Sequence, residues 1–117
     1  MMKKKIRRGP SPAGVLTKFV VAYLQARGHL VWRNNTTGVF DPATGRFRMN
    51  AKIRKGVADV IGLTKEGIHL EVEIKIGRDR MSVFQENHAK EIVRRSGIYI
   101  VAKTIDGFQS DARRFGL

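Results

Sequence analysis

The amino-acid sequence predicts an α/β domain built from layers of helix and sheet. Residues 12–27 and 82–95 carry apolar side chains at helical spacing, and short runs rich in β-branched and aromatic residues lie between and after them. The expected order is α-β-β-β-β-α-β. A chain of 117 residues has room for one core of ordinary size, and no repeat or long linker divides it.

Residues 1–10 are predicted to be a flexible basic arm, and residues 11–117 the single folded domain. The first eight residues contain five cations, and a glycine and two prolines follow within four positions. Ser11 and Pro12 match an N-cap and a first helical position, so the first helix is expected to begin there. It is expected to end near Arg27, because a glycine follows.

The remaining elements follow from composition and turn signals. Strands are expected at residues 29–33, 57–63, 68–76 and 98–103, and a hairpin with arms near 39–40 and 46–49. Ser82 and Gln85 form a capping-box pattern that opens the second helix. A short terminal helix is expected over residues 106–115.

The charge of the chain predicts a polyanionic partner. There are 23 Lys and Arg against 10 Asp and Glu, a net charge of +13, which favours DNA, RNA or an anionic membrane. Without cysteine, disulfides and thiolate zinc sites are excluded, which fits a reducing compartment. No apolar run approaches the roughly 18 residues of a membrane span, and no signal-peptide stretch opens the chain. We therefore expect a cytoplasmic protein.

The acidic residues are informative because they are few. Glu71, Glu73 and Lys75 alternate along one expected strand, so they share a face while the apolar residues between them take the other. Asp59 lies in an otherwise apolar strand, where an unpaired carboxylate is costly. If these strands are hairpin neighbours, Asp59 and Glu73 can meet, and they repel each other unless a cation intervenes. Mg²⁺ suits such a site because it takes oxygen ligands and keeps waters that interact with phosphate.

Two less specific interpretations remain open. Glu71, Glu73 and Lys75 can be the solvated face of an amphipathic strand. Asp59 can form a structural salt bridge with Lys75. The alternating triplet on its own favours the first interpretation, whereas Asp59 within an apolar strand favours a carboxylate that is paired or bound to metal.

Gly56-Val57-Ala58-Asp59, followed in the next strand by Glu73-Ile74-Lys75, resembles the motif of the PD-(D/E)XK nuclease superfamily. More narrowly, the chain resembles the virus-type replication-repair nuclease (VRR-NUC) family over about residues 12–108. The further matching segments are Arg33-Asn34-Asn35, Gly45-Arg46, Lys55-Gly56, Ser82-Val83-Phe84-Gln85 and the strand that begins Gly97-Ile98-Tyr99. The ordered set is more specific than the short acidic motif alone.

The resemblance implies a restriction-endonuclease-like core with a mixed central sheet flanked by helices. It implies that Asp59, Glu73 and the backbone carbonyl of Ile74 bind Mg²⁺ or Mn²⁺, with Glu71 as a further candidate ligand. Lys75 would position the attacking water, and Gln85 would support the site from the second helix. The family commonly supplies another acidic residue from its first helix, and residues 11–27 contain none, which puts a two-metal site in doubt.

Cationic residues on both sides of the acidic motif are the candidate DNA contacts. They are Arg33, Arg46, Arg48, Lys52, Arg54, Lys55, Arg78 and Arg80. The competing interpretation is that they are solubilising surface charges. The aromatic residues Trp32, Phe40 and Phe47 are candidates for stacking on bases, but their strand spacing favours a place in the core. His29, His69 and His88 lack metal-ligand spacing.

These expectations lead to a metal-dependent DNA endonuclease that hydrolyses phosphodiester bonds. A small basic domain has limited surface for reading sequence, so structure-selective cutting is expected. The resemblance implies that the substrate is branched or Holliday-junction-like DNA. The resemblance implies a homodimer, with two active sites on one branched substrate, in the cytoplasm of a bacterial or phage-infected cell. The alternatives are a non-catalytic basic nucleic-acid-binding protein whose carboxylates form structural salt bridges, and a restriction-type enzyme specific for a short duplex sequence.

Overall fold

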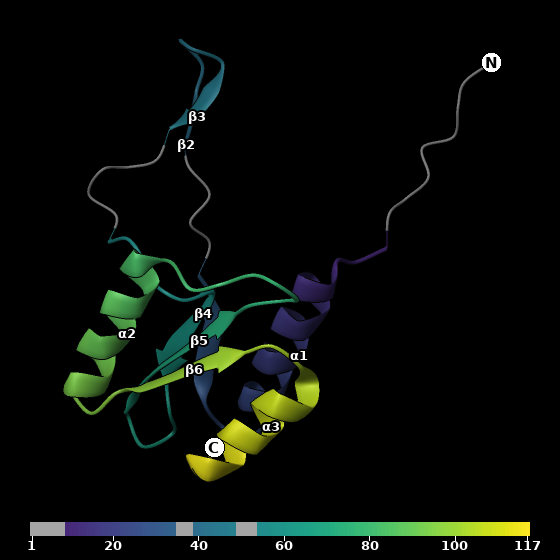
Figure 1. Ribbon diagram of the computed structural model, residues 1–117, viewed down its shortest axis with the longest axis vertical. Helices are drawn as coiled ribbons and strands as arrows, with labels where there is room; N and C mark the ends of the chain where they lie inside the picture. Colours follow the sequence, from purple (N-terminus) through teal and green to yellow (C-terminus); the bar gives the residue numbers. More distant parts are fainter. Residues whose placement is uncertain (1–8, 35–38, 49–53) are drawn as a thin grey trace.

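The computed structural model describes residues 9–34, 39–48 and 54–117 (Figure 1). The expected basic arm lies outside these residues, apart from its last two positions. The elements in chain order are α1 (Pro12–Ala26), β1 (Leu30–Arg33), β2 (Val39–Asp41), β3 (Arg46–Arg48), β4 (Val60–Leu63), β5 (His69–Ile74), α2 (Val83–Arg94), β6 (Ile98–Ala102) and α3 (Ile105–Arg114). Within the described residues, no helix combines the length and the apolar character needed to cross a membrane.

The main sheet has four strands in the order β1-β4-β5-β6. β1 pairs antiparallel with β4, and β4 pairs antiparallel with β5. β6 pairs parallel with β5 after the chain crosses through α2. The expected α/β class is therefore confirmed, and the sheet is mixed.

The observed number of strands differs from the expected order in one respect. β2 and β3 pair only with each other, as a separate two-stranded sheet, so five strands precede α2. The tight turn explains this pairing, because Asp41 Oδ1 accepts a hydrogen bond from Ala43 N at 2.9 Å and Gly45 takes a positive φ of 67°. The terminal helix expected over residues 106–115 is confirmed as α3, which begins where the Thr104 hydroxyl accepts from Gly107 N at 3.0 Å.

The two predicted N-caps are present. The Ser11 hydroxyl accepts from Gly14 N at 3.1 Å and Pro12 opens α1. At α2, the Ser82 hydroxyl accepts from Gln85 N at 3.1 Å while Gln85 Oε1 accepts from Ser82 N at 2.9 Å. This reciprocal pair is the predicted capping box.

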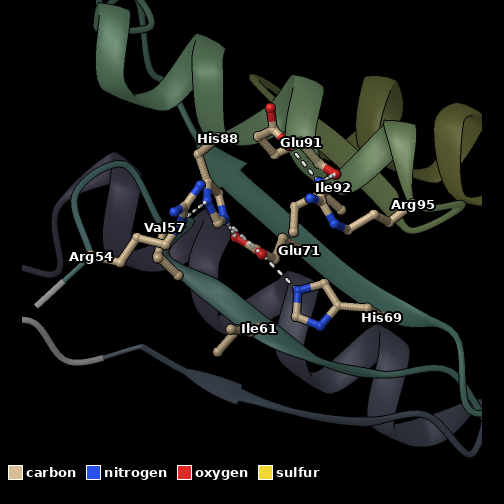
Figure 2. A pocket seen from close by; sticks show the side chains of 9 residues that line it. All are labelled: Arg54, Val57, Ile61, His69, Glu71, His88, Glu91, Ile92 and Arg95. Carbon is tan, nitrogen blue, oxygen red and sulfur yellow. Dashed lines mark hydrogen bonds and ion pairs between the residues drawn. The ribbon is translucent and has the colours of Figure 1, made fainter.

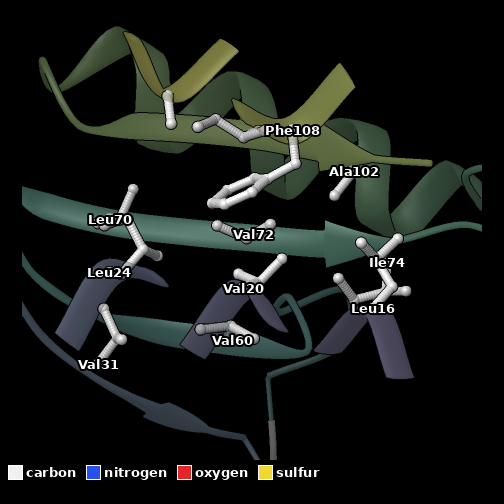
Figure 3. Packing of buried hydrophobic residues seen from close by; sticks show 12 residues of the cluster. Leu16, Val20, Leu24, Val31, Val60, Leu70, Val72, Ile74, Ala102 and Phe108 are labelled. Carbon is white, nitrogen blue, oxygen red and sulfur yellow. The ribbon is translucent and has the colours of Figure 1, made fainter. Parts of the chain in front are cut away.

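α1 and α3 cover one face of the sheet and bury the apolar core (Figure 3). Leu70, Val72 and Ile74 of β5 point into this core, where Val20 of α1 and Phe108 of α3 are fully buried. Because neighbouring residues of a strand take opposite faces, the polar residues of β5 point to the other side. α2 lies on that side and packs against β6.

The expectation that Trp32 and Phe40 belong to the core is wrong. Trp32 is 48% exposed and Phe40 is 52% exposed. β1 is the edge strand of the sheet, and Trp32 lies opposite Ile61, on the face away from the apolar core. Phe40 lies in the separate hairpin. The side chain of Phe47 lies outside what the structure describes.

Phe108 should be essential for packing the third helix on the sheet. Phe108→Ala should lower the free energy of unfolding by about 3–5 kcal/mol, because it leaves a cavity in the core. Phe115→Ala is the matched control, since that ring is 42% exposed and its removal should cost less than about 1 kcal/mol. Urea unfolding of the two variants measures both values, and equal losses would contradict the assigned core.

Candidate active site

The polar face of β5 and the residue before β4 form the candidate active site. Val60 of β4 lies opposite Val72 of β5, so the same register continued by one residue brings Asp59 opposite Glu73. Lys75 follows two positions after Glu73 and shares its face. The three side chains that the sequence singles out therefore lie together under the α2 side of the sheet.

Asp59 is held by hydrogen bonds at its side chain and its backbone. Its Oδ2 accepts from Ile74 N at 2.8 Å, which ties the carboxylate to the end of β5. Asn34, just after β1, donates its N–H to Asp59 O at 2.7 Å, and its side-chain amide donates to Ala58 O at 3.3 Å. These contacts fix the carboxylate between β1 and β5.

Glu73 is a buried carboxylate that the protein satisfies only in part. Its residue exposure is 3%, and its Oε2 has no hydrogen-bond partner among the described residues. Burial, and then the hydrogen-bonded neighbouring charge of Asp59, raise the pKa of Glu73 from its ordinary value of 4.5 to about 8. At neutral pH Glu73 is therefore mostly protonated in the absence of a cation.

Lys75 brings a buried positive charge to this pair. Its Nζ lies 3.9 Å from Glu73 Oε1, and its backbone N–H donates to Ala102 O of β6 at 2.9 Å. Its charge lowers the pKa of Glu73 but does not outweigh burial and Asp59. Lys75 therefore supplies one positive charge beside two carboxyl groups. When both carboxyl groups are ionised, the site can bind a further cation.

The donor set fits a hard divalent cation. The free Glu73 oxygen and the raised pKa are what two carboxylates show when the charge that would compensate them is missing. No group of three His, Cys, Asp or Glu side chains in the described part of the chain is arranged to hold a metal ion. An ion at Asp59 and Glu73 would therefore need a backbone carbonyl and waters to complete its shell, and the carbonyl of Ile74 is the expected one.

No protein-family model, curated protein or solved structure matches the chain. The resemblance to the VRR-NUC family therefore stays a prediction. A function has to be inferred from the site itself.

Glu71 does not join the acidic pair as a further ligand, because the protein satisfies it fully (Figure 2). Its Oε1 accepts from Ala58 N at 3.0 Å and from His88 Nε2 at 2.8 Å, and its Oε2 lies 2.6 Å from His69 Nε2. Burial alone raises the pKa of Glu71, but the hydrogen bonds from Ala58, His69 and His88 outweigh burial and lower it. Glu71 is therefore an ionised structural carboxylate.

The hydrogen bonds of His88 define its tautomer. Arg54 Nε donates to His88 Nδ1 at 2.9 Å, and because arginine cannot accept, this ring nitrogen must be the acceptor. The proton of the neutral ring is then on Nε2, which donates to Glu71. Neither nitrogen is free for a metal ion, so the chain Arg54–His88–Glu71 is structural.

Gln85 has a structural role at the start of α2. Its side-chain oxygen accepts from Ser82 N in the capping box, and the structure gives it no contact with Asp59 or Glu73. The backbone from Phe84 to Gln85 N lies against Gly56, where a β-carbon would overlap Phe84 O. Gly56 has a positive φ of 88°, which glycine adopts without strain. A role of Gln85 in catalysis stays a prediction.

The candidate DNA-binding cations are dispersed around the site. Arg33 ends β1, Arg46 begins β3, and both are exposed. Lys55 lies over the Phe84 ring, 4.9 Å from its centroid. The exposed residues Arg78 and Arg80 follow β5, whereas Lys52 and the side chain of Arg48 lie outside the described part of the chain.

Three residues of the site were not identified from the sequence. His69 and His88 bind Glu71, and Tyr99 of β6 lies beside Glu71 in the parallel register. The Tyr99 hydroxyl is buried and has no partner among the described residues; burial, followed by the charges of Glu73, Glu71 and Asp59, raises its pKa. The alternation of His69 with Glu71 was the one signal available, since the other two contacts depend on how α2 and β6 dock.

Without a divalent cation, ionisation of Glu73 should destabilise the fold. The pKa is raised from 4.5 to about 8 on folding, so the stabilisation by the protonated form is complete below pH 4.5 and is lost as the pH rises through about 8. In chelator, this group should reduce the free energy of unfolding by about 1.4 kcal/mol per pH unit within that window.

Urea unfolding at a series of pH values measures this dependence. Glu73→Gln should remove the decline, and Glu66→Gln, in the exposed turn before β5, should retain it. A wild-type profile that coincides with that of Glu73→Gln would contradict the assigned pKa.

Proposed function

We propose that the protein is a metal-dependent endonuclease that hydrolyses phosphodiester bonds of DNA, with a restriction-endonuclease-like PD-(D/E)XK core. One observation carries the proposal: Asp59 and the buried Glu73 form a carboxylate pair in which one Glu73 oxygen has no partner among the described residues, and Lys75 lies beside it. A structural ion pair with Lys75 has no need for a second carboxyl group. A site that binds a divalent cation and a phosphate does.

Asp59, Glu73 and the backbone carbonyl of Ile74 would hold Mg²⁺ or Mn²⁺. When bound, the ion supplies positive charge that stabilises the negative charge developing on the phosphate. Hydrolysis joins a water oxygen to phosphorus and breaks one P–O ester bond, leaving one end as a phosphate and the other as a hydroxyl. Lys75 holds the attacking water through its ammonium hydrogens and stabilises the phosphate oxygens as charge builds up.

A single ion is the simpler stoichiometry for this chain. α1 contributes no acidic residue, and Glu71 is fully engaged with Ala58 and two histidines. A second ion would therefore lack a carboxylate ligand of its own. The proposal is thus a one-metal site.

DNA is the proposed substrate because of the charge of the whole chain. A net charge of +13 favours a polyanion, and the exposed Arg33, Arg54 and Arg78 lie near the ends of the strands that carry the acidic pair. Selectivity for branched or Holliday-junction-like DNA, and a homodimer that brings two sites to one junction, rest on the resemblance to the VRR-NUC family.

The alternative function is that of a non-catalytic basic nucleic-acid-binding protein, and the hydrogen bonds of Glu71 agree with it. That carboxylate is buried, ionised and saturated with protein donors, as a structural group should be. Glu73 differs, because one of its oxygens has no donor and its pKa is raised. The contrast between two carboxylates on one strand favours the enzyme.

A substrate panel tests both activity and selectivity. The full chain is incubated with four-way junction, flap, duplex and single-stranded DNA, with Mg²⁺, with Mn²⁺ and with chelator. The proposal predicts cleavage that needs metal and is strongest on branched DNA. Binding to all substrates without any cleavage would leave the non-catalytic alternative, and cleavage only at one short duplex sequence would indicate a restriction-type enzyme.

Single substitutions test the roles of the residues. Asp59→Ala and Lys75→Ala should each reduce the cleavage rate by at least about 100-fold, because each removes a group acting on the reacting phosphate. Lys18→Ala is the matched control, since Lys18 is an exposed lysine of α1 on the opposite side of the sheet. The DNA affinity of all three variants should differ from that of the wild type by less than about threefold. A Lys75→Ala variant that cleaves at the wild-type rate would contradict the assigned role.

A further inference from the structure

Among the described residues, no element covers an apolar surface on the α2 side of the sheet. It consists of Leu30 and Trp32 of β1 and Ile61 and Leu63 of β4, and we call it the β1–β4 surface. Leu30 lies opposite Leu63 and Trp32 opposite Ile61, so the four side chains share one face. Leu30 is 63%, Trp32 48% and Leu63 40% exposed, because α2 packs over β6 at the far side of the sheet.

The β1–β4 surface borders a pocket whose lining includes two arginines. Ile61 also lines an open pocket of about 710 Å³ between α2 and the sheet (Figure 2). Arg54 and Arg95 line the same pocket, together with Val57 and Ile92. An apolar floor therefore meets cationic groups at one edge.

Arg54 is the cation in this pocket that is oriented and available. Its Nε donates to His88, whose ring is anchored on the buried Glu71, and it makes no ion pair within the described residues. The two terminal amino groups of the guanidinium remain for a ligand. Arg95, in contrast, is ion-paired with Glu91.

The surface also lies next to the acidic pair. Trp32, Ile61 and Glu71 form one row across the three strands, and Asn34, Asp59 and Glu73 form the row two residues further along. Two residues of strand span about 7 Å. A ligand on Trp32 is therefore a near neighbour of a phosphate at Asp59 and Glu73.

We propose that the β1–β4 surface and Arg54 bind unpaired nucleotides of the DNA strand, with a base stacked on Trp32 and a phosphate on Arg54. The proposal rests on the proposed nuclease function and specifies its substrate as DNA with a single-stranded segment beside the cut. Base stacking on an aromatic ring is tolerant of sequence and needs an exposed base face, which duplex DNA keeps inside the helix. Arginine binds phosphate through paired N–H groups.

Charge favours this occupant over a second copy of the chain. A DNA strand brings phosphates to Arg54, whereas a second copy would bring another arginine rather than a negative charge. Because Arg54 has no ion pair within the described residues, an apolar contact over it would also desolvate its charge without compensation. Self-association is retained as an outcome of the test.

The single tryptophan of the chain makes the proposal directly measurable. Trp32 fluorescence is followed in chelator, where no cleavage occurs, while the full chain is titrated with single-stranded oligothymidine, a blunt duplex or heparin. Single-stranded DNA should quench the emission strongly, whereas the duplex and heparin should bind and leave it nearly unchanged. Equal quenching by heparin, or binding of single-stranded DNA without quenching, would overturn the proposal.

Variants separate stacking from charge, and they are measured by anisotropy of a labelled strand. Trp32→Leu should weaken single-stranded binding about tenfold and leave duplex binding within about twofold. Phe115→Leu, at an exposed ring near the C-terminus, is the matched control and should change neither. Arg54→Gln should weaken single-stranded binding and reduce its salt dependence by about one phosphate contact.

The outcomes distinguish this proposal from the nuclease function. Metal-dependent cleavage together with no quenching by single-stranded DNA would refute the nucleotide site alone. Quenching without any cleavage would refute the nuclease and leave the strand-binding surface. A dimer in light scattering that Trp32→Leu dissociates would assign the surface to self-association and would also overturn the proposal.

Discussion

The structure depends on a polar sheet face that is buried. His69, Glu71 and Glu73 of β5 share one sheet face with Lys75, which follows the strand, and the last three are at most 9% exposed. Burying a charge costs free energy unless partners compensate it. The two glutamates meet this constraint in opposite ways, and the function of the site follows from the difference.

Glu71 is compensated from three directions, by a backbone amide of the segment before β4, by His69 on its own strand and by His88 on α2. These bonds join α2 to the sheet, and they continue to Arg54, so one buried carboxylate also orients a cation at the rim. Glu73 has only a distant lysine and a repulsive neighbour, Asp59. Rigid support next to an uncompensated pair is the arrangement that a cation site needs, because the ligands must be held close although they repel each other.

The sequence predicted the acidic pair because its geometry is local. Alternation along β5 determines which residues share a face, and the short turn between β4 and β5 makes them antiparallel neighbours, which brings Asp59 to Glu73. The partners of Glu71 could not be predicted, because His88 reaches it only through the way α2 docks at Gly56. The exposure of Trp32 likewise depends on β1 being an edge strand whose outer face α2 does not cover, and strand spacing contains no information on that.

Calorimetric titration with Mn²⁺, without DNA, tests the central claim that Asp59 and Glu73 form a cation site. At about pH 7, in two buffers of different ionisation enthalpy, it gives the number of protons released per ion bound. The account predicts saturable binding with release of about one proton, because a pKa of about 8 keeps Glu73 protonated until the ion binds. The substitutions Asp59→Asn and Glu73→Gln should each abolish the Mn²⁺ binding and the proton release. Absence of binding, or binding that neither substitution changes, would contradict the account.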